Sequence, residues 1–85
     1  MKVIYSSNFL RTYRQLPGNV KSRAEDKEII FRKNPFDQRL KTHKLTGSFA
    51  DFWAFSVDYR HRIIFEFRGK NMAIFHKIGD HSIYL

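Results

Sequence analysis

The stretch DFWAFSVDYRHRIIFEFRGKNMAIFHKIG (51–79) decides the fold because apolar and polar residues alternate through most of it. The segments DFWAFSVDY (51–59) and HRIIFEFR (61–68) both show a period of two, which is typical of half-buried strands. GKN (69–71) is a tight turn before a third apolar run, MAIFHKIG (72–79). Three strands joined by connections this short predict an antiparallel meander. The residues predicted to face the core are Trp53, Phe55, Val57, Ile63, Phe65 and Phe67.

Upstream of this meander, the sequence predicts a strand followed by a short helix. KVIYS (2–6) is rich in β-branched and aromatic residues, as strands are. Ser6 and Ser7 offer an N-cap, and LPGN (16–19) contains the Pro and Gly that end a helix. Between these signals, apolar residues recur at helical spacing. They are Phe9, Leu10, Tyr13 and Leu16.

A second helix is predicted from Asn19, as the cap, to Lys33, where NPFD (34–37) ends it because the residue before Pro avoids the helical region. Residues 34–48 show no clear period, and DHSIYL (80–85) is expected to form a short strand extension or one helical turn. The predicted class is α+β with the order β-α-α-β-β-β. An N-terminal strand and a helical hairpin would pack on a curved antiparallel sheet, within one domain over residues 1–85.

The charge balance limits the classes of partner. Sixteen Lys and Arg stand against eight Asp and Glu, which gives a net charge of +8. A folded domain this basic is typical of proteins that meet a polyanion, although a net charge also serves general solubility. The chain contains no Cys, which excludes disulfides and thiolate metal sites and fits a reducing cytoplasm. Neither a signal peptide nor an apolar run of about 20 residues is present, so we expect a cytoplasmic protein without a membrane partner.

Cations and imidazoles at the predicted strand ends are the candidates for chemistry. The sequence has no phosphate-binding glycine loop and no HExxH motif, and its four His are spread along the chain, so we expect no metal and no cofactor. Metal-free RNA cleavage needs a base for the 2′-hydroxyl, an acid for the leaving 5′-oxygen and a cation for the phosphate. Arg62 suits the last role and His81 either proton-transfer role. The two would meet only if the sheet curls into a groove on the face of Arg62.

The order and spacing of these motifs resemble the second half of the RelE/ParE toxin superfamily, whose pattern is roughly KL.G, W, V, R.IY, IG.H and Y. HKLTG (43–47) and IGDHSIYL (78–85) look closest to its YafQ-like branch, and the chain as a whole to the YafQ-like and RelE-like mRNA interferases. The first half also fits, with a strand, a helix ending in LP, a second helix and then NP. The matching positions are Lys44, Leu45, Gly47, Trp53, Val57, Arg62, Ile63, Phe65, Ile78, Gly79 and His81.

The resemblance implies a toxin of a type II toxin–antitoxin pair that cuts mRNA in the ribosomal A site without a metal. Its partners would be a cognate antitoxin, the mRNA and ribosomal RNA. Arg62 then corresponds to the phosphate-binding arginine, and His43 and His81 to the histidines of the YafQ-like branch. Tyr84 is the fourth catalytic candidate, because YoeB-like members end in a His-Tyr pair. The expected RNA-binding residues are Arg39, Lys41, Lys44, Arg60 and His61.

Two questions stay open on the sequence alone. Which residue is the base and which the acid is not assigned. A ParE-like toxin of the same fold, which inhibits DNA gyrase and cleaves nothing, is the alternative function, and a basic binding module without toxicity is the third possibility. The presence of both Arg62 and His81 favours the nuclease, because a gyrase inhibitor needs no proton-transfer group.

Overall fold

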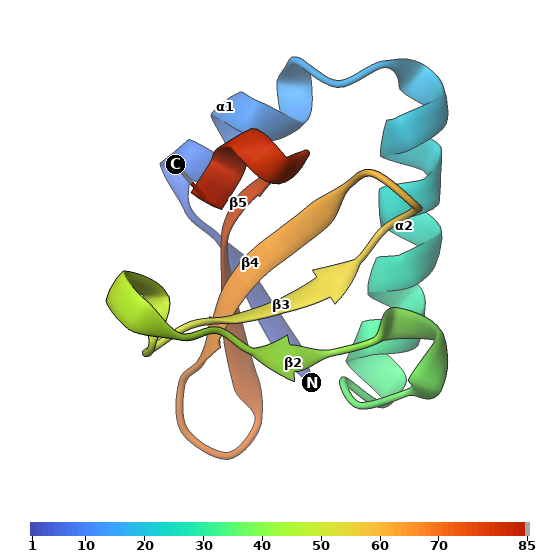
Figure 1. Ribbon diagram of the computed structural model, residues 1–85. Coiled ribbons are helices and arrows are strands. Elements are labelled where there is room, and N and C mark those ends of the chain that lie inside the picture. Colours follow the sequence, from blue (N-terminus) through green and yellow to red (C-terminus); the bar gives the residue numbers. More distant parts are fainter. Residues whose placement is uncertain (85) are drawn as a thin grey trace.

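Five strands form the central sheet of the computed structural model, which describes residues 1–84 (Figure 1). The three meander strands are antiparallel neighbours, as predicted. The N-terminal strand joins the same sheet by pairing in parallel with the last strand, so the sheet is mixed. The strands, in the spatial order β1-β5-β4-β3-β2, are β1 Lys2–Tyr5, β2 His43–Lys44, β3 Trp53–Ser56, β4 Arg62–Phe67 and β5 Met72–Gly79.

Two helices, α1 Ser7–Arg14 and α2 Gly18–Lys33, precede the meander. Ser6 caps α1 as predicted, because its side chain accepts a hydrogen bond from the Phe9 N–H. The predicted cap Asn19 is wrong: α2 begins one residue earlier and Pro17 is its N-cap, without a side-chain cap hydrogen bond. Pro17 fulfils this role because its carbonyl accepts the first helical hydrogen bonds, from the N–H groups of residues 20 and 21.

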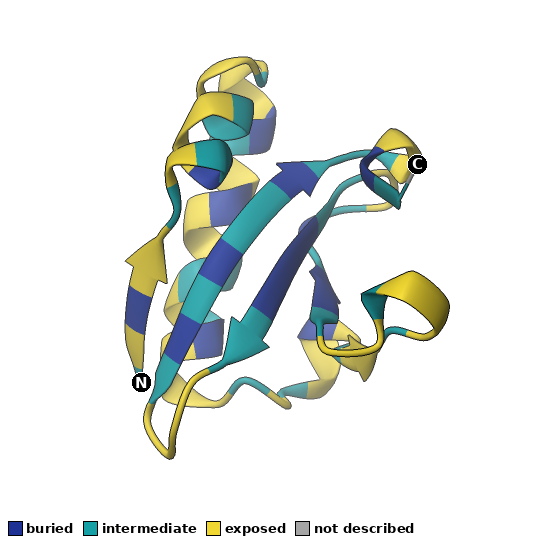
Figure 2. Cartoon of the chain, turned by 90° about the vertical axis from the view of Figure 1, so that its left-hand side faces the viewer, coloured by how far each residue is buried: buried dark blue, intermediate teal, exposed yellow. Residues whose placement is uncertain are grey.

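Aromatic rings dominate the core between the helices and the sheet. Phe31 of α2 is fully buried, and its ring centroid lies 5.0 Å from that of Phe55, 4.9 Å from that of Phe65 and 5.2 Å from that of Phe75. Edge-to-face and offset rings at these separations stabilise a core beyond their area burial. Figure 2 shows this burial as dark patches along the strands, with exposed residues on the outer side of the helices. Of the core residues predicted from the alternating pattern, Phe55, Val57, Ile63 and Phe65 are buried, and Trp53 and Phe67 are partly buried and pack against them.

A β-bulge changes the alternation of β5. Ile64 pairs with Lys77 and Phe65 with Phe75, so His76 is the extra residue on β5. Phe75 and Ile78 therefore both belong to the core, although they are three residues apart. The His76 imidazole instead lies 2.9 Å from a Glu66 carboxylate oxygen.

Three short 3-10 turns complete the chain: η1 Gln38–Leu40, η2 Gly47–Phe49 and η3 His81–Tyr84. The helical alternative predicted for residues 80–85 is thus confirmed over 81–84, while Leu85 lies outside the described residues. The predicted α+β class and element order are confirmed, with β2 as a short additional edge strand. No helix within residues 1–84 is both long and apolar enough to cross a bilayer.

Candidate active site

An open hollow of about 550 Å³ lies where α2, η1, the β3–β4 turn and η3 meet. Arg62 and His81, the two residues predicted to share a groove, both line it. Two of the expected RNA-binding residues line it as well, which makes the hollow strongly cationic. The full lining is Lys27, Arg39, Lys41, Ser56, Val57, Asp58, Tyr59, Arg62 and His81.

The turn before β4 fixes the guanidinium of Arg62. Its Nη1 donates to the carbonyl oxygens of Asp58 at 2.8 Å, His61 at 3.0 Å and Tyr59 at 3.4 Å. None of the ion pairs found among residues 1–84 includes Arg62. The remaining N–H groups of the planar fork are therefore available for an anionic ligand such as a phosphate.

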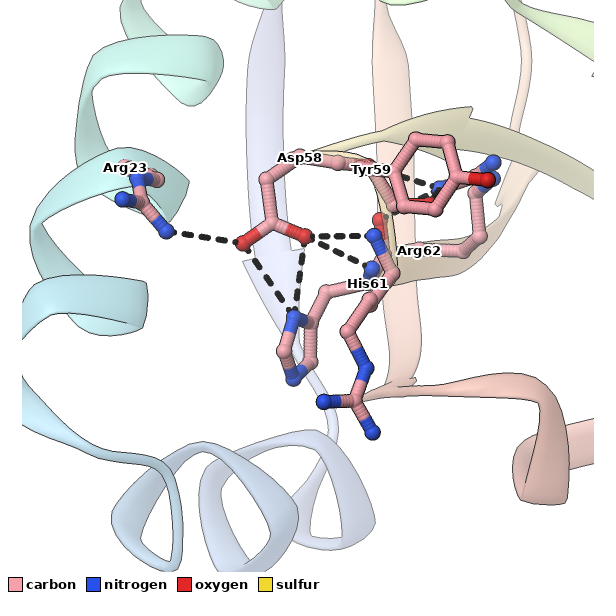
Figure 3. Close-up of polar contacts among 6 residues, drawn as sticks. Arg23, Asp58, Tyr59, His61 and Arg62 are labelled. Carbon is pink, nitrogen blue, oxygen red and sulfur yellow. Dashed lines mark hydrogen bonds and ion pairs between the residues drawn. The ribbon is translucent and has the colours of Figure 1, made fainter.

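Asp58 holds this turn in place (Figure 3). Its Oδ1 accepts from the backbone N–H groups of Arg60 and His61, both at 2.8 Å, and lies 2.9 Å from Nδ1 of His61. Its Oδ2 accepts from Arg23 of α2 at 3.2 Å. Burial raises the pKa of Asp58, but the hydrogen bonds from His61 and from the two backbone N–H groups outweigh it and lower that pKa to about 2. The carboxylate is therefore ionised at neutral pH and occupied by its partners.

The end of β5 positions His81. Asp80 directly precedes η3: its Oδ1 accepts from the Ser82 N–H at 3.0 Å, and its carbonyl accepts from the Ile83 N–H at 3.1 Å. Ile83 is buried and packs so closely over Gly79 that a Cβ at position 79 would overlap with Ile83 Cγ2. His81 itself is exposed, so its imidazole is accessible to a substrate in the hollow.

Three more cations surround the hollow, and they differ in their partners. Arg39 makes two hydrogen bonds of 2.9 Å to Asp37, and these bonds lower the pKa of Asp37 to about 2. Much of the charge of Arg39 is thus already compensated. Lys41 ends η1 with a left-handed backbone at φ 52°, and Lys27 reaches the hollow from α2. Neither lysine takes part in an ion pair among residues 1–84.

The other sequence-predicted residues lie outside the lining of this hollow. His43 and Lys44 are exposed on the edge strand β2, where His43 Nδ1 lies 3.0 Å from the Lys41 carbonyl oxygen. Tyr84 packs edge to face on Phe49, with ring centroids 6.1 Å apart. Burial raises the pKa of Tyr84, while the positive charge of Arg62 acts in the opposite direction, so the two groups are within electrostatic reach.

Arg60 and His61 line a second hollow, of about 530 Å³, on the other side of the β3–β4 turn. The His61 ring is held by Asp58, as described above, and its side chain is 17% exposed. Arg60 is exposed. Within residues 1–84, no three His, Asp or Glu side chains form a group that could hold a metal ion.

Three charged or aromatic residues of the site, Lys27, Asp58 and Tyr59, are not predicted from the sequence. Lys27 falls close to the apolar stripe of its helix, and that position is the signal that would have placed it beside the sheet. Asp58 precedes Tyr59 in a short connection between two strands, where Asp commonly accepts hydrogen bonds from the backbone two residues on. Nothing in the sequence indicates that the Tyr59 ring is left in solvent.

Comparison with known proteins identifies the fold. No family model and no curated protein sequence matches the chain. Among solved structures, YafQ from E. coli strain BL21(DE3) superimposes with a TM-score of 0.81 at 17% identity, covering 99% of this chain and 97% of that one. The YoeB/ParE toxin from Agrobacterium tumefaciens superimposes with a TM-score of 0.80 at 18% identity, covering 95% of this chain and 99% of that one. RelE in the RelB-RelE antitoxin-toxin complex from Methanococcus jannaschii superimposes with a TM-score of 0.75 at 20% identity, covering 95% of this chain and 94% of that one. This chain therefore shares the fold of these YafQ, YoeB/ParE and RelE toxins.

Proposed function

We propose that this chain is the toxin of a type II toxin–antitoxin system and a ribosome-dependent mRNA endoribonuclease. The main observation in support is that Arg62 and His81 line one open cationic hollow, although 18 residues separate them in the chain. The toxins that share its fold support the biological role.

The proposed reaction uses the RNA's own 2′-hydroxyl as the nucleophile. The 2′-oxygen forms a bond to phosphorus and the bond from phosphorus to the 5′-oxygen breaks, leaving a 2′,3′-cyclic phosphate and a 5′-hydroxyl. A base accepts the proton of the 2′-hydroxyl and an acid donates one to the 5′-oxygen. The reaction neither consumes nor produces electrons, and it needs no co-reactant.

Arg62 is assigned to the scissile phosphate. Its free N–H groups would donate to the non-bridging oxygens, whose negative charge increases in the transition state. The three carbonyl contacts orient the guanidinium before the substrate arrives, so little reorganisation is needed at the moment of reaction.

His81 is assigned to one of the two proton transfers, because it is exposed and lines the same hollow as Arg62. Tyr84 is the first candidate for the other transfer, since the Arg62 charge acts on its hydroxyl. His43, which lies on β2 away from the lining, is the second.

An antitoxin protein is the proposed regulator. YoeB of Staphylococcus aureus has been solved as a YoeB-YefM complex, and RelE of Methanococcus jannaschii as a complex with RelB. For a chain with a net charge of +8, the expected inhibitor is a segment with acidic and apolar residues that folds on binding.

The function is tested by inducible expression in cells, followed by primer extension on a reporter mRNA with an intact or a mutated start codon. The wild type is expected to arrest growth and to cut only the translated reporter. Arg62→Ala and His81→Ala should each reduce cleavage by about 100-fold or more, the range of a lost acid, base or phosphate ligand. Arg68→Ala is the matched control, because Arg68 is an exposed arginine at the other end of β4 that pairs with Glu66.

Two outcomes would refute the nuclease. Growth arrest with intact mRNA and induction of the SOS response would assign the chain to the gyrase-inhibiting toxins. Cleavage by both active-site variants at wild-type rates, at equal protein levels, would show that the Arg62–His81 hollow is not the catalytic site.

A further inference from the structure

Tyr59 is the most exposed large apolar residue among residues 1–84, with 93% of its surface accessible. It lies in the turn that joins β3 to β4, two residues after the buried Val57. A single exposed apolar residue is common on protein surfaces, so the exposure of Tyr59 matters here because of the groups that surround it.

The backbone beneath this ring is held firmly. The Val57 N–H donates to the His61 carbonyl at 2.9 Å, which closes the turn, and Asp58 accepts from the N–H groups of Arg60 and His61. The Tyr59 carbonyl in turn accepts from Arg62 Nη1 at 3.4 Å. Tyr59 is therefore an exposed ring on an ordered base, which reduces the entropy lost when it binds a ligand.

Tyr59 also lines two cationic hollows. Asp58 and Tyr59 are the only described residues that line both of them. Arg62 belongs to the first hollow, and Arg23 and Arg60 belong to the second. Asp58 is the only carboxylate in either lining among residues 1–84, and Arg23 and His61 already occupy it.

We infer that Tyr59 is a stacking platform for one nucleobase of a single-stranded RNA, whose backbone runs from the Arg62 hollow to the Arg60 hollow. This subsite rests on the proposed function, because it places the stacked base beside the phosphate held by Arg62. Arg62, the Tyr59 ring and Arg60 would contact, in this order, one phosphate, the base and the next phosphate of the RNA strand. Every base has a π-face, so stacking tolerates any sequence, while the cations hold the backbone.

The inference is tested by binding a short 2′-O-methyl oligoribonucleotide, which cannot be cleaved, and an abasic oligomer with the same number of phosphates. The wild type should bind the base-containing oligomer more tightly than the abasic one. Tyr59→Ala should lose about 5- to 150-fold in affinity for the former, which is ~1–3 kcal/mol at ~1.4 kcal/mol per tenfold. Its affinity for the abasic oligomer should change little.

Tyr59→Phe and Tyr59→Trp keep an aromatic face and should keep the preference for bases. The new indole in Tyr59→Trp should also lose fluorescence when the base-containing oligomer binds, and lose little with the abasic one. Ile29→Ala is the matched control, since Ile29 is an exposed apolar residue of α2 that lines neither hollow. Thermal unfolding of each variant shows whether the fold is retained, which the exposure of Tyr59 leads us to expect.

Three results would overturn the inference: a wild type that binds both oligomers equally, a Tyr59→Ala variant that keeps the preference for bases, or a loss confined to antitoxin binding. The last would assign the ring to a protein partner. If the wild type cuts translated mRNA but Tyr59→Ala still prefers the base-containing oligomer, only the stacking subsite is refuted. A wild type that cuts no mRNA refutes the proposed function, whatever Tyr59 does in the binding assay.

Discussion

Arg62 combines two kinds of contact that only a guanidinium can make together. One nitrogen donates to the carbonyls of the preceding turn, while the same side chain lines the hollow. An ammonium group offers three donors at a single point, so it cannot be held by the turn and also present a planar pair to a phosphate. A substitution that keeps the positive charge of residue 62 but loses its oriented donors can therefore separate the two contributions.

Arg62→Lys should therefore retain RNA affinity better than it retains cleavage. We expect cleavage to fall at least about 10-fold, because the phosphate loses the oriented donors that act in the transition state. Binding of the uncleavable oligomer should fall by less, since the positive charge remains. Single-turnover cleavage and equilibrium binding measure the two effects separately. Equal losses in both would show that orientation by the turn carbonyls contributes nothing.

Asp58→Asn should destabilise the protein in a pH-dependent way. The folded pKa of Asp58 is about 2 against an ordinary value of 3.8, which corresponds to roughly 2 kcal/mol of stabilisation. A lowered folded pKa gives stability that is present above the unfolded pKa and is lost as the pH falls through the folded one. The difference between wild type and Asp58→Asn in urea unfolding should be full at pH 7 and shrink between about pH 4 and pH 2. A difference independent of pH would contradict the ionic role of Asp58.

The strands of the meander could be read from their residues, whereas their irregularities could not. Phe55, Ile63 and Phe65 reveal their faces because burial on one side of a sheet imposes a period of two. The bulge at His76 is a tertiary property: Phe75 and Ile78 have odd spacing, which the sequence shows without saying where the extra residue lies. β2 has only two residues, too few for any period, and it exists because β3 offers it a free edge.

The site was partly predictable for a similar reason. Arg62 and His81 stand at the ends of strands, so a sheet of known order brings them together. The place of Tyr59 depends on how the β3–β4 turn is oriented, and no local pattern contains that information, whereas the only signal for Lys27 is its position close to the apolar stripe of α2. The position of Tyr84 against Phe49 likewise depends on how η2 meets η3.

Gly79 is expected to control the position of η3, and through it His81. Gly79→Ala would force Ile83 away from β5, at a cost of about 1–3 kcal/mol for overpacking. The cleavage rate should fall by more than the loss of folded protein explains, because the displaced turn carries His81. In the Ile83→Ala background, where Cγ2 is absent, adding Gly79→Ala should have little further effect on unfolding. Additive losses in the urea unfolding of the double variant would show that the Gly79–Ile83 contact is not the cause.

The net charge of +8 is unevenly compensated across the molecule. Arg23, Arg32, Arg39 and Arg68 each pair with a carboxylate, whereas the ion pairs among residues 1–84 include neither Lys27, Lys41 nor Arg62. These three unpaired cations line the same hollow, and nine further unpaired Lys and Arg lie elsewhere among residues 1–84. A polyanion bound in the hollow is attracted by all three of its unpaired cations at once.

This distribution predicts the salt dependence of RNA binding. Each phosphate contact to a single strand contributes about −0.7 to the slope of log affinity against log salt, so three uncompensated cations predict about −2 from this hollow. Lys27→Ala and Lys41→Ala should each reduce the slope by about 0.7. Arg39→Ala should change it less, because Asp37 already neutralises Arg39 and is itself set free by the substitution. Arg11 bonds to Asn8 on α1 and lies outside the hollow, so Arg11→Ala is the control that should leave the slope unchanged.

The slopes come from titrating the uncleavable oligomer between ~50 and ~200 mM KCl. If Arg39→Ala lowered the slope as much as Lys41→Ala, ion pairing would not decide which cations bind phosphate, and the hollow would act only through its total charge.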